Sequence, residues 1–120
     1  MEVIFMAETP KSILKTVKNG LLIVDTYTAF DQRIIDYINT AISTLIQIGY
    51  YYADNFEVTG EDETWSDLIP DTGFNMVKTF VVEYVSLLFD PPTSSFALDA
   101  KQKYVEELEV RIRYKLESGD

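Results

Sequence analysis

Apolar residues recur every three or four positions over most of this chain, a spacing typical of helices rather than strands. The clearest stripe predicts a long helix over 28–48, with Thr28 as its N-cap, Asp31 in its first turn and Gly49 at its end. The helix would be roughly 30 Å long at 1.5 Å per residue. Its apolar members are Ile34, Ile35, Ile38, Ala41, Ile42, Leu45 and Ile48.

A shorter helix is predicted ahead of it, over 10–19. Thr9 can cap this helix, and Pro10 suits its first position because no backbone N–H is needed there. Gly20 marks its end. Its apolar face consists of Ile13, Leu14 and Val17.

The middle of the chain has a different hydrophobic pattern from the segments on either side. Residues 50–63 lack a helical stripe and are predicted to form a loop. A helical turn from Trp65 to Ile69 follows, capped by Thr64 and closed by Pro70.

Two further helices are predicted in the second half. One spans 74–89 and stops at Asp90-Pro91-Pro92, because proline disfavours helical backbone in the residue before it. The other spans 95–117, is capped by Ser94 or Ser95, and carries Glu-to-Arg pairs one turn apart at 107/111 and 109/113. Its predicted buried stripe is Phe96, Ala100, Tyr104, Leu108 and Ile112.

Composition agrees with a single folded domain over 1–120, in which 1–9 would be an arm that is flexible or ordered by a partner. Of the 120 residues, 47% are apolar and 25% are charged. The chain has no cysteine and no histidine, which excludes disulfides, Cys-based zinc sites and every catalytic triad that needs histidine. No apolar run is long enough for a membrane span, and we expect no signal peptide and synthesis in the cytoplasm.

The net charge of −10 is concentrated in one segment. Residues 50–73 hold seven acids and no base, whereas the segments on either side are close to neutral. Such a segment repels phosphate, so tight non-specific binding of nucleic acid is disfavoured.

Few residues suggest chemistry, and each has an ordinary structural explanation. Glu61, Asp62 and Glu63 form either a solvated acidic loop, the commoner case, or a loose site for a divalent ion. The glutamates at 106, 107 and 109 favour surface ion pairs over acid–base catalysis. No cofactor is expected, since the scattered glycines form no phosphate-binding loop.

Aromatic residues leave two questions open. Tyr50, Tyr51 and Tyr52 cannot all face one core, so at least one is expected to be exposed or to contact a partner. Trp65 is expected to anchor the acidic loop to the core rather than to make an intermolecular contact.

Several blocks together resemble the head–tail connector proteins of tailed bacteriophages and prophages, also described as DNA-packaging or head-completion proteins. The most specific block is Leu87–Phe96, which reads LLFDPPTSSF. The others are KTFV at 78–81, ELE at 107–109 with Arg111, INTAIS at 38–43 with QIG at 47–49, and WSDL at 65–68. The likeness covers about residues 10–117.

The resemblance implies an all-α fold, a small bundle of about four helices with an acidic mid-chain loop, and a structural protein rather than an enzyme. It implies a homo-oligomeric ring of about a dozen subunits in the virion neck, assembled in the host cytoplasm. The implied partners are the portal protein above and a downstream neck or tail-completion protein below. DNA would pass through without specific binding, and no membrane is involved. The alternative is a small helical adaptor or regulatory module that binds a host protein.

Two surfaces are candidates for contacts. Residues 54–71 would line the channel or reach a neighbouring subunit, or would simply be a solvated loop. The basic end of the last helix, Arg111, Arg113 and Lys115, would either favour the negative end of the helix dipole or dock an acidic portal surface. In the second case Glu117–Asp120 would become ordered on docking.

Overall fold

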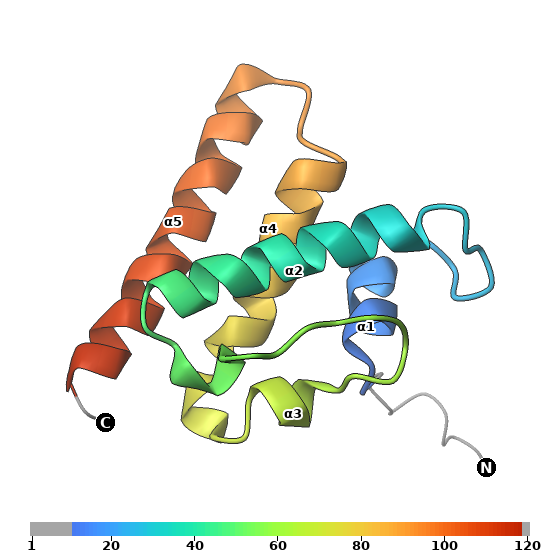
Figure 1. Cartoon of the computed structure of the whole chain (residues 1–120). Coiled ribbons are helices and arrows are strands. Elements are labelled where there is room, and N and C mark those ends of the chain that lie inside the picture. Colours follow the sequence, from blue (N-terminus) through green and yellow to red (C-terminus); the bar gives the residue numbers. More distant parts are fainter. Residues whose placement is uncertain (1–10, 119–120) are drawn as a thin grey trace, which may run out of the picture.

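The computed structural model describes residues 11–118. Within them the chain forms α-helices and short 3-10 turns, and no strand beyond one isolated bridge between Ser12 and Thr64 (Figure 1). The all-α prediction is confirmed. The elements are α1 (Ile13–Gly20), α2 (Asp31–Gln47), the 3-10 turn η2 (Tyr51–Ala53), α3 (Trp65–Leu68), the 3-10 turn η3 (Thr72–Phe74), α4 (Met76–Phe89) and α5 (Ser95–Ser118).

Helix α4 is the centre of the packing. It contacts α1, α2 and α5, and its apolar residues point in most directions around the helix. Figure 1 shows α4 and α5 side by side and antiparallel, with α2 crossing them. The antiparallel pair follows from the short link between them, where Asp90-Pro91-Pro92 ends α4 as predicted and the Ser94 hydroxyl accepts from Ala97 N at 3.1 Å.

Three predicted helix starts were too early. Helix α1 begins at Ile13 with Ser12 as its cap, and Thr9 and Pro10 lie outside the described residues. Helix α2 begins at Asp31 rather than 28, and Thr28 contributes only its backbone carbonyl, to Asp31 N. Helix α4 begins at Met76 rather than 74, because η3 occupies the preceding residues. The prediction for α3 is confirmed at its start, where Thr64 and Asp67 form a reciprocal capping box.

A buried lysine explains where α2 begins. The Lys18 side chain is 1% exposed, and its ammonium lies 2.8 Å from Asp31 Oδ1. It also donates to the carbonyl oxygens of Asp25 at 3.1 Å and Tyr27 at 2.8 Å. Asp31 Oδ1 is itself buried and has no hydrogen-bond partner apart from this ion pair. A buried cation must be paired, so the loop 21–30 folds back over Lys18 and helix geometry starts only at Asp31.

The acidic loop is attached to the core at several points. Asn39 on α2 donates to Val58 O and accepts from Val58 N, both at 2.9 Å, and Val58 is buried. Backbone bonds join Ile13 N to Glu63 O and Trp65 N to Lys11 O. The segment predicted to be a loop is therefore attached to α1 and α2 along much of its length.

Trp65 anchors the end of that loop, as predicted. Its indole is 7% exposed and donates to Thr16 Oγ1 on α1 at 2.9 Å. Its ring also lies beneath the Lys78 ammonium, 5.7 Å from the ring centroid.

The predicted buried stripe of α5 was partly wrong. Leu108 and Ile112 are buried, but their partner on that face is Val105, whereas Phe96 is 85% exposed and Ala100 and Tyr104 are also exposed. Helix α5 packs mainly on α4, so only a narrow face is covered and the periodic aromatic positions fall on the opposite side. Both predicted ion pairs are present, Arg111 with Glu107 and Arg113 with Glu109.

Replacing Lys18 by methionine tests the buried cation. Lys18→Met leaves the Asp31 carboxylate and two loop carbonyls without their partner, so we expect a loss of about 3 kcal/mol in unfolding free energy. The melting temperature in calorimetry should fall by roughly 10 °C. Lys15→Met is the control, because the Lys15 side chain is 39% exposed and its ion pair with Glu61 spans 3.8 Å. Equal melting of the two variants would contradict this account.

Replacing Asn39 by alanine tests the attachment of the acidic loop. Asn39→Ala leaves both backbone groups of buried Val58 unsatisfied and should cost about 2 kcal/mol. Hydrogen exchange of the Val58 amide should accelerate with it. Gln32→Ala removes an amide from an exposed position of the same helix and should change stability by less than about 0.5 kcal/mol. If Asn39→Ala leaves exchange at Val58 unchanged, the loop is held by other contacts.

Candidate interaction surfaces

Several exposed apolar side chains belong to two surfaces at separate places on the molecule. We define the loop surface as Leu22, Val24, Tyr27 and Phe30, which lie between α1 and α2. We define the α5 groove as the hollow lined by Met76, Val110, Arg111, Tyr114, Lys115 and Ser118. Exposed apolar patches of this kind commonly mark contacts with other proteins.

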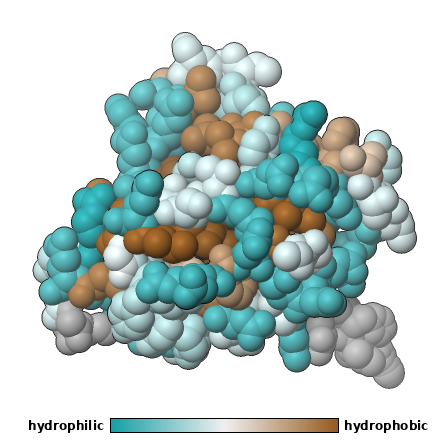
Figure 2. Space-filling view, viewed as in Figure 1, coloured by the Kyte–Doolittle hydropathy of each residue, from teal (hydrophilic) through white to brown (hydrophobic). Residues whose placement is uncertain are grey.

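The loop surface projects from the body of the fold. Figure 1 shows the loop 21–30 extending beyond the start of α2, and Figure 2 shows hydrophobic side chains at the same edge of the molecule. Leu22 is 93% exposed and has a φ of +63°, the left-handed region that side chains other than glycine seldom adopt. Tyr27 and Phe30 stack edge to face at 5.7 Å, and Phe30 packs in the same way on Phe89 at 5.4 Å. An extended apolar tip therefore stands on an ordered base.

The α5 groove lies where the C-terminal half of α5 meets the start of α4. It has a volume of about 490 Å³, and Tyr114 on its wall is 72% exposed. Lys115 lies over the Phe74 ring at 5.4 Å from the centroid, and it has no carboxylate partner within residues 11–118. The groove therefore combines apolar walls with a lysine that forms no ion pair in residues 11–118, although the Asp71 carboxylate lies close to it beside Gly73.

The tyrosine triplet is divided between core and surface. Tyr50 is fully buried, donates its hydroxyl to Leu68 O at 2.8 Å and packs on Phe74 at 5.3 Å. Burial raises the pKa of Tyr50 far above its ordinary value, so this phenol remains a proton donor. Tyr51 is 59% exposed and Tyr52 half-buried, and these two stack on each other at 4.5 Å. Only they could meet a partner, and Tyr50 must be removed from the candidate contacts.

The three acids at the tip of the acidic loop have different surroundings. Glu63 accepts from Thr59 Oγ1 at 2.8 Å and from Gly60 N at 3.3 Å. Partial desolvation would raise the pKa of Glu63, but these hydrogen bonds outweigh it and lower the pKa. Glu61 and Asp62 are exposed. Across residues 11–118 no three carboxylates come together in a way that could hold a metal ion.

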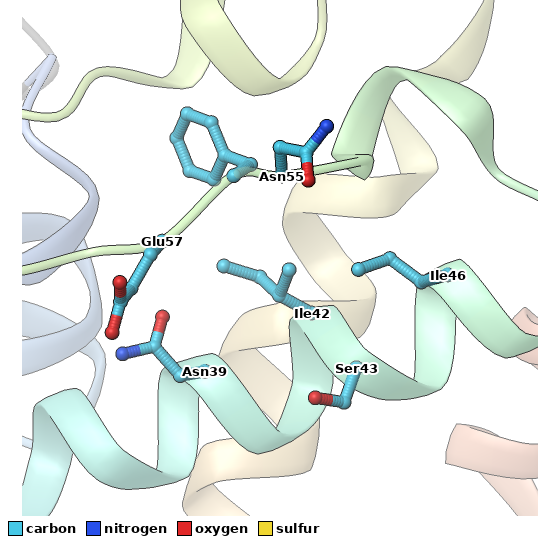
Figure 3. A pocket seen from close by; sticks show the side chains of 7 residues that line it. Asn39, Ile42, Ser43, Ile46, Asn55 and Glu57 are labelled. Carbon is cyan, nitrogen blue, oxygen red and sulfur yellow. The ribbon is translucent and has the colours of Figure 1, made fainter.

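A second hollow, of about 410 Å³, lies between α2 and the loop 55–57. Figure 3 shows Ile42 and Ile46 of α2 facing this loop, with Asn39, Ser43 and Glu57 around them. Asn39 is already engaged with Val58, and Glu57 is the one titratable side chain among the residues that line the hollow. The hollow therefore offers one carboxylate and no second titratable side chain among its lining residues.

The basic end of α5 is largely neutralised within the helix. Arg111 and Arg113 each pair with a glutamate one turn earlier, and of the three predicted cations only Lys115 has no acidic partner in the described part of the chain. The predicted contact residues thus fall on different sides of the molecule: Tyr51 and Tyr52 beside η2, Glu61 and Asp62 on the loop, and Lys115 in the α5 groove.

The loop surface was missed at the level of sequence. Two signals could have found it. Leu21–Val24 is an apolar run that lies after the glycine ending the first helix, where no stripe can bury it. Lys18 lies one turn after Leu14, on the apolar face of α1, which indicates a cation that must find partners nearby.

Comparison with known proteins agrees with the resemblance noted above. No helix in residues 11–118 has both the length and the apolar content needed to cross a bilayer. No curated protein and no solved structure matches the chain. The family model described as phage connector protein matches residues 13–119, nearly the whole chain and all of the described fold except its first two residues. The chain therefore belongs to the phage connector protein family, whose members are structural, non-enzymatic proteins of the virion neck.

Proposed function

We propose that the protein forms a homo-oligomeric ring of about a dozen subunits beneath the portal, joins the phage head to the tail, and lets DNA pass during packaging completion and ejection. The observation that carries this proposal is the family match over residues 13–119. Its partners in this role are other copies of itself, the portal protein, and a downstream neck or tail-completion protein.

The surface of the monomer supports assembly. A closed ring needs a heterologous interface, in which one patch meets a different patch on the next copy. The loop surface and the α5 groove are two such unlike patches, and they lie at different ends of the fold (Figure 1). Many apolar side chains remain exposed on α5 in the isolated chain, as expected of a subunit that is covered by neighbours.

The charge distribution supports passage of DNA. The segment 54–71 contains all seven acids of the acidic region and no base. If it faces the channel, it repels the phosphate backbone and keeps DNA from adhering to the wall. Its attachment to α2 and α1 would hold these charges in place.

Self-association tests the ring directly. Sedimentation over a range of concentrations should show species heavier than the 13.8 kDa chain, in a fraction that rises with concentration. Negative-stain microscopy with portal protein should show closed rings. A strict monomer at near-millimolar concentration, together with no ring on the portal, would contradict the proposal.

Charge reversal tests the position of the acidic segment. In the double variant Glu61→Lys and Asp62→Lys, affinity for duplex DNA should rise and phage yield should fall, because the wall would attract phosphate. Glu63 is left unchanged, since it holds the loop. The control is the double variant Asp90→Lys and Glu106→Lys, which changes net charge equally at two exposed positions elsewhere. Unchanged yield in the first variant would exclude a channel-lining role for these acids.

A further inference from the structure

We propose that the loop surface of one subunit inserts into the α5 groove of the next copy, and that this contact closes the ring. The inference rests on the proposed ring and identifies the two surfaces that build it. The occupant of the groove is thus a second copy of this chain, which presents Leu22 and Val24 as its apolar tip.

The loop surface has the properties of an inserting element. Its tip side chains make little use of their own fold, since Leu22 is 93% exposed and Val24 is exposed as well. The base is rigid, because the buried Lys18 ammonium binds the Asp25 and Tyr27 carbonyls and the Asp31 carboxylate. A loop already ordered in the free subunit loses little conformational entropy on binding.

The backbone at the tip supports the same conclusion. Leu22 holds a left-handed φ of +63° although it is not a glycine, while its side chain points away from the core. Strained backbone persists where the surroundings over-determine it, and such sites often serve binding. At Leu22 this backbone conformation exposes a large aliphatic side chain to solvent, so that no burial of this side chain stabilises the isolated monomer.

The α5 groove has matching chemistry. Its walls include Met76, Val110 and Tyr114, which suit aliphatic side chains, and its edge carries Lys115. The projecting loop carries an exposed acid, Asp25, whose carboxylate has no partner within residues 11–118. Lys115 likewise forms no ion pair there, although Asp71 lies close to it beside Gly73, so insertion would pair two charges that form no ion pair in the free subunit.

The hollow beside α2 fits the loop surface less well. The hollow between α2 and the loop 55–57 carries Glu57, which would repel Asp25, and Asn39 on its wall is already engaged. Position favours the α5 groove too, because in Figure 1 the loop 21–30 and the end of α5 project on opposite sides of the molecule. In a ring built by head-to-tail contacts, each subunit must present its two different contact surfaces on opposite sides.

The experiment is ring assembly of full-length variants, with portal protein present, scored by microscopy and sedimentation. Leu22→Asp disables the loop surface, and Tyr114→Asp disables the α5 groove. Both side chains are exposed, so calorimetry should show a fold as stable as the original. We expect each variant alone to lower ring yield about tenfold or more. An equimolar mixture should form dimers but no rings, since only one intact pair of surfaces can then meet.

Exchanging the charges at positions 25 and 115 tests whether ring assembly can be restored. Asp25→Lys and Lys115→Asp should each reduce ring yield about tenfold, and the double variant should restore it. Phe96→Asp and Lys103→Glu are the controls, because both positions are exposed on α5 outside the groove. They should assemble normally.

Each outcome bears on a separate claim. Rings from the original chain but equally good rings from Leu22→Asp and Tyr114→Asp would overturn this interface and leave the ring itself intact. Normal self-assembly of Tyr114→Asp with loss of portal capture would show that the groove binds the portal instead, and would also overturn it. Absence of rings from the original chain would contradict the proposed function itself.

Discussion

The fold depends on covering α4. This helix is apolar around most of its circumference, so no single neighbour can bury it, and α1, α2 and α5 each cover part of it. Its buried side chains, Val77, Phe80, Val81 and Val85, belong to the same apolar core as those of the helices around it, and removing this apolar surface from water stabilises the fold. The positions of the other long helices are largely consequences of this requirement.

Two polar side chains, Lys18 and Asn39, hold loops against that core. Lys18 supplies three donors beneath the loop 21–30 and thereby holds in place a segment that contributes little to the core. Asn39 does the equivalent for the acidic loop, through paired hydrogen bonds to Val58. Both act on segments without regular structure, where a buried side chain must replace the bonds that a helix would make internally.

This arrangement leaves some apolar side chains of α5 and of the loop surface in contact with water. Helix α5 is covered on one narrow face by α4, and its other face keeps Phe96, Tyr104, Val110 and Tyr114 in contact with water. The loop surface is equally exposed. Because the family suggests contacts with other phage head and tail proteins, such exposed residues are candidates for those contacts.

The sequence by itself determined the local features: the all-α class, the α4 stop at Asp90-Pro91-Pro92, the Thr64 cap, the ion pairs along α5, and the family. These depend on residues a few positions apart, and their physics is contained in the spacing. Tertiary structure decided which face of α5 is buried, that Tyr50 enters the core while Tyr51 does not, and where α2 begins. Each of these depends on a partner distant in sequence or in a neighbouring element: α4, Leu68 and Lys18 respectively. Of the candidate interaction surfaces, Lys115 and the acidic loop were predicted, whereas the loop 21–30 was not. The sequence places Lys18 on the apolar face of α1, but only the tertiary structure shows that its ammonium binds the Asp25 and Tyr27 carbonyls and so holds this loop in its exposed position.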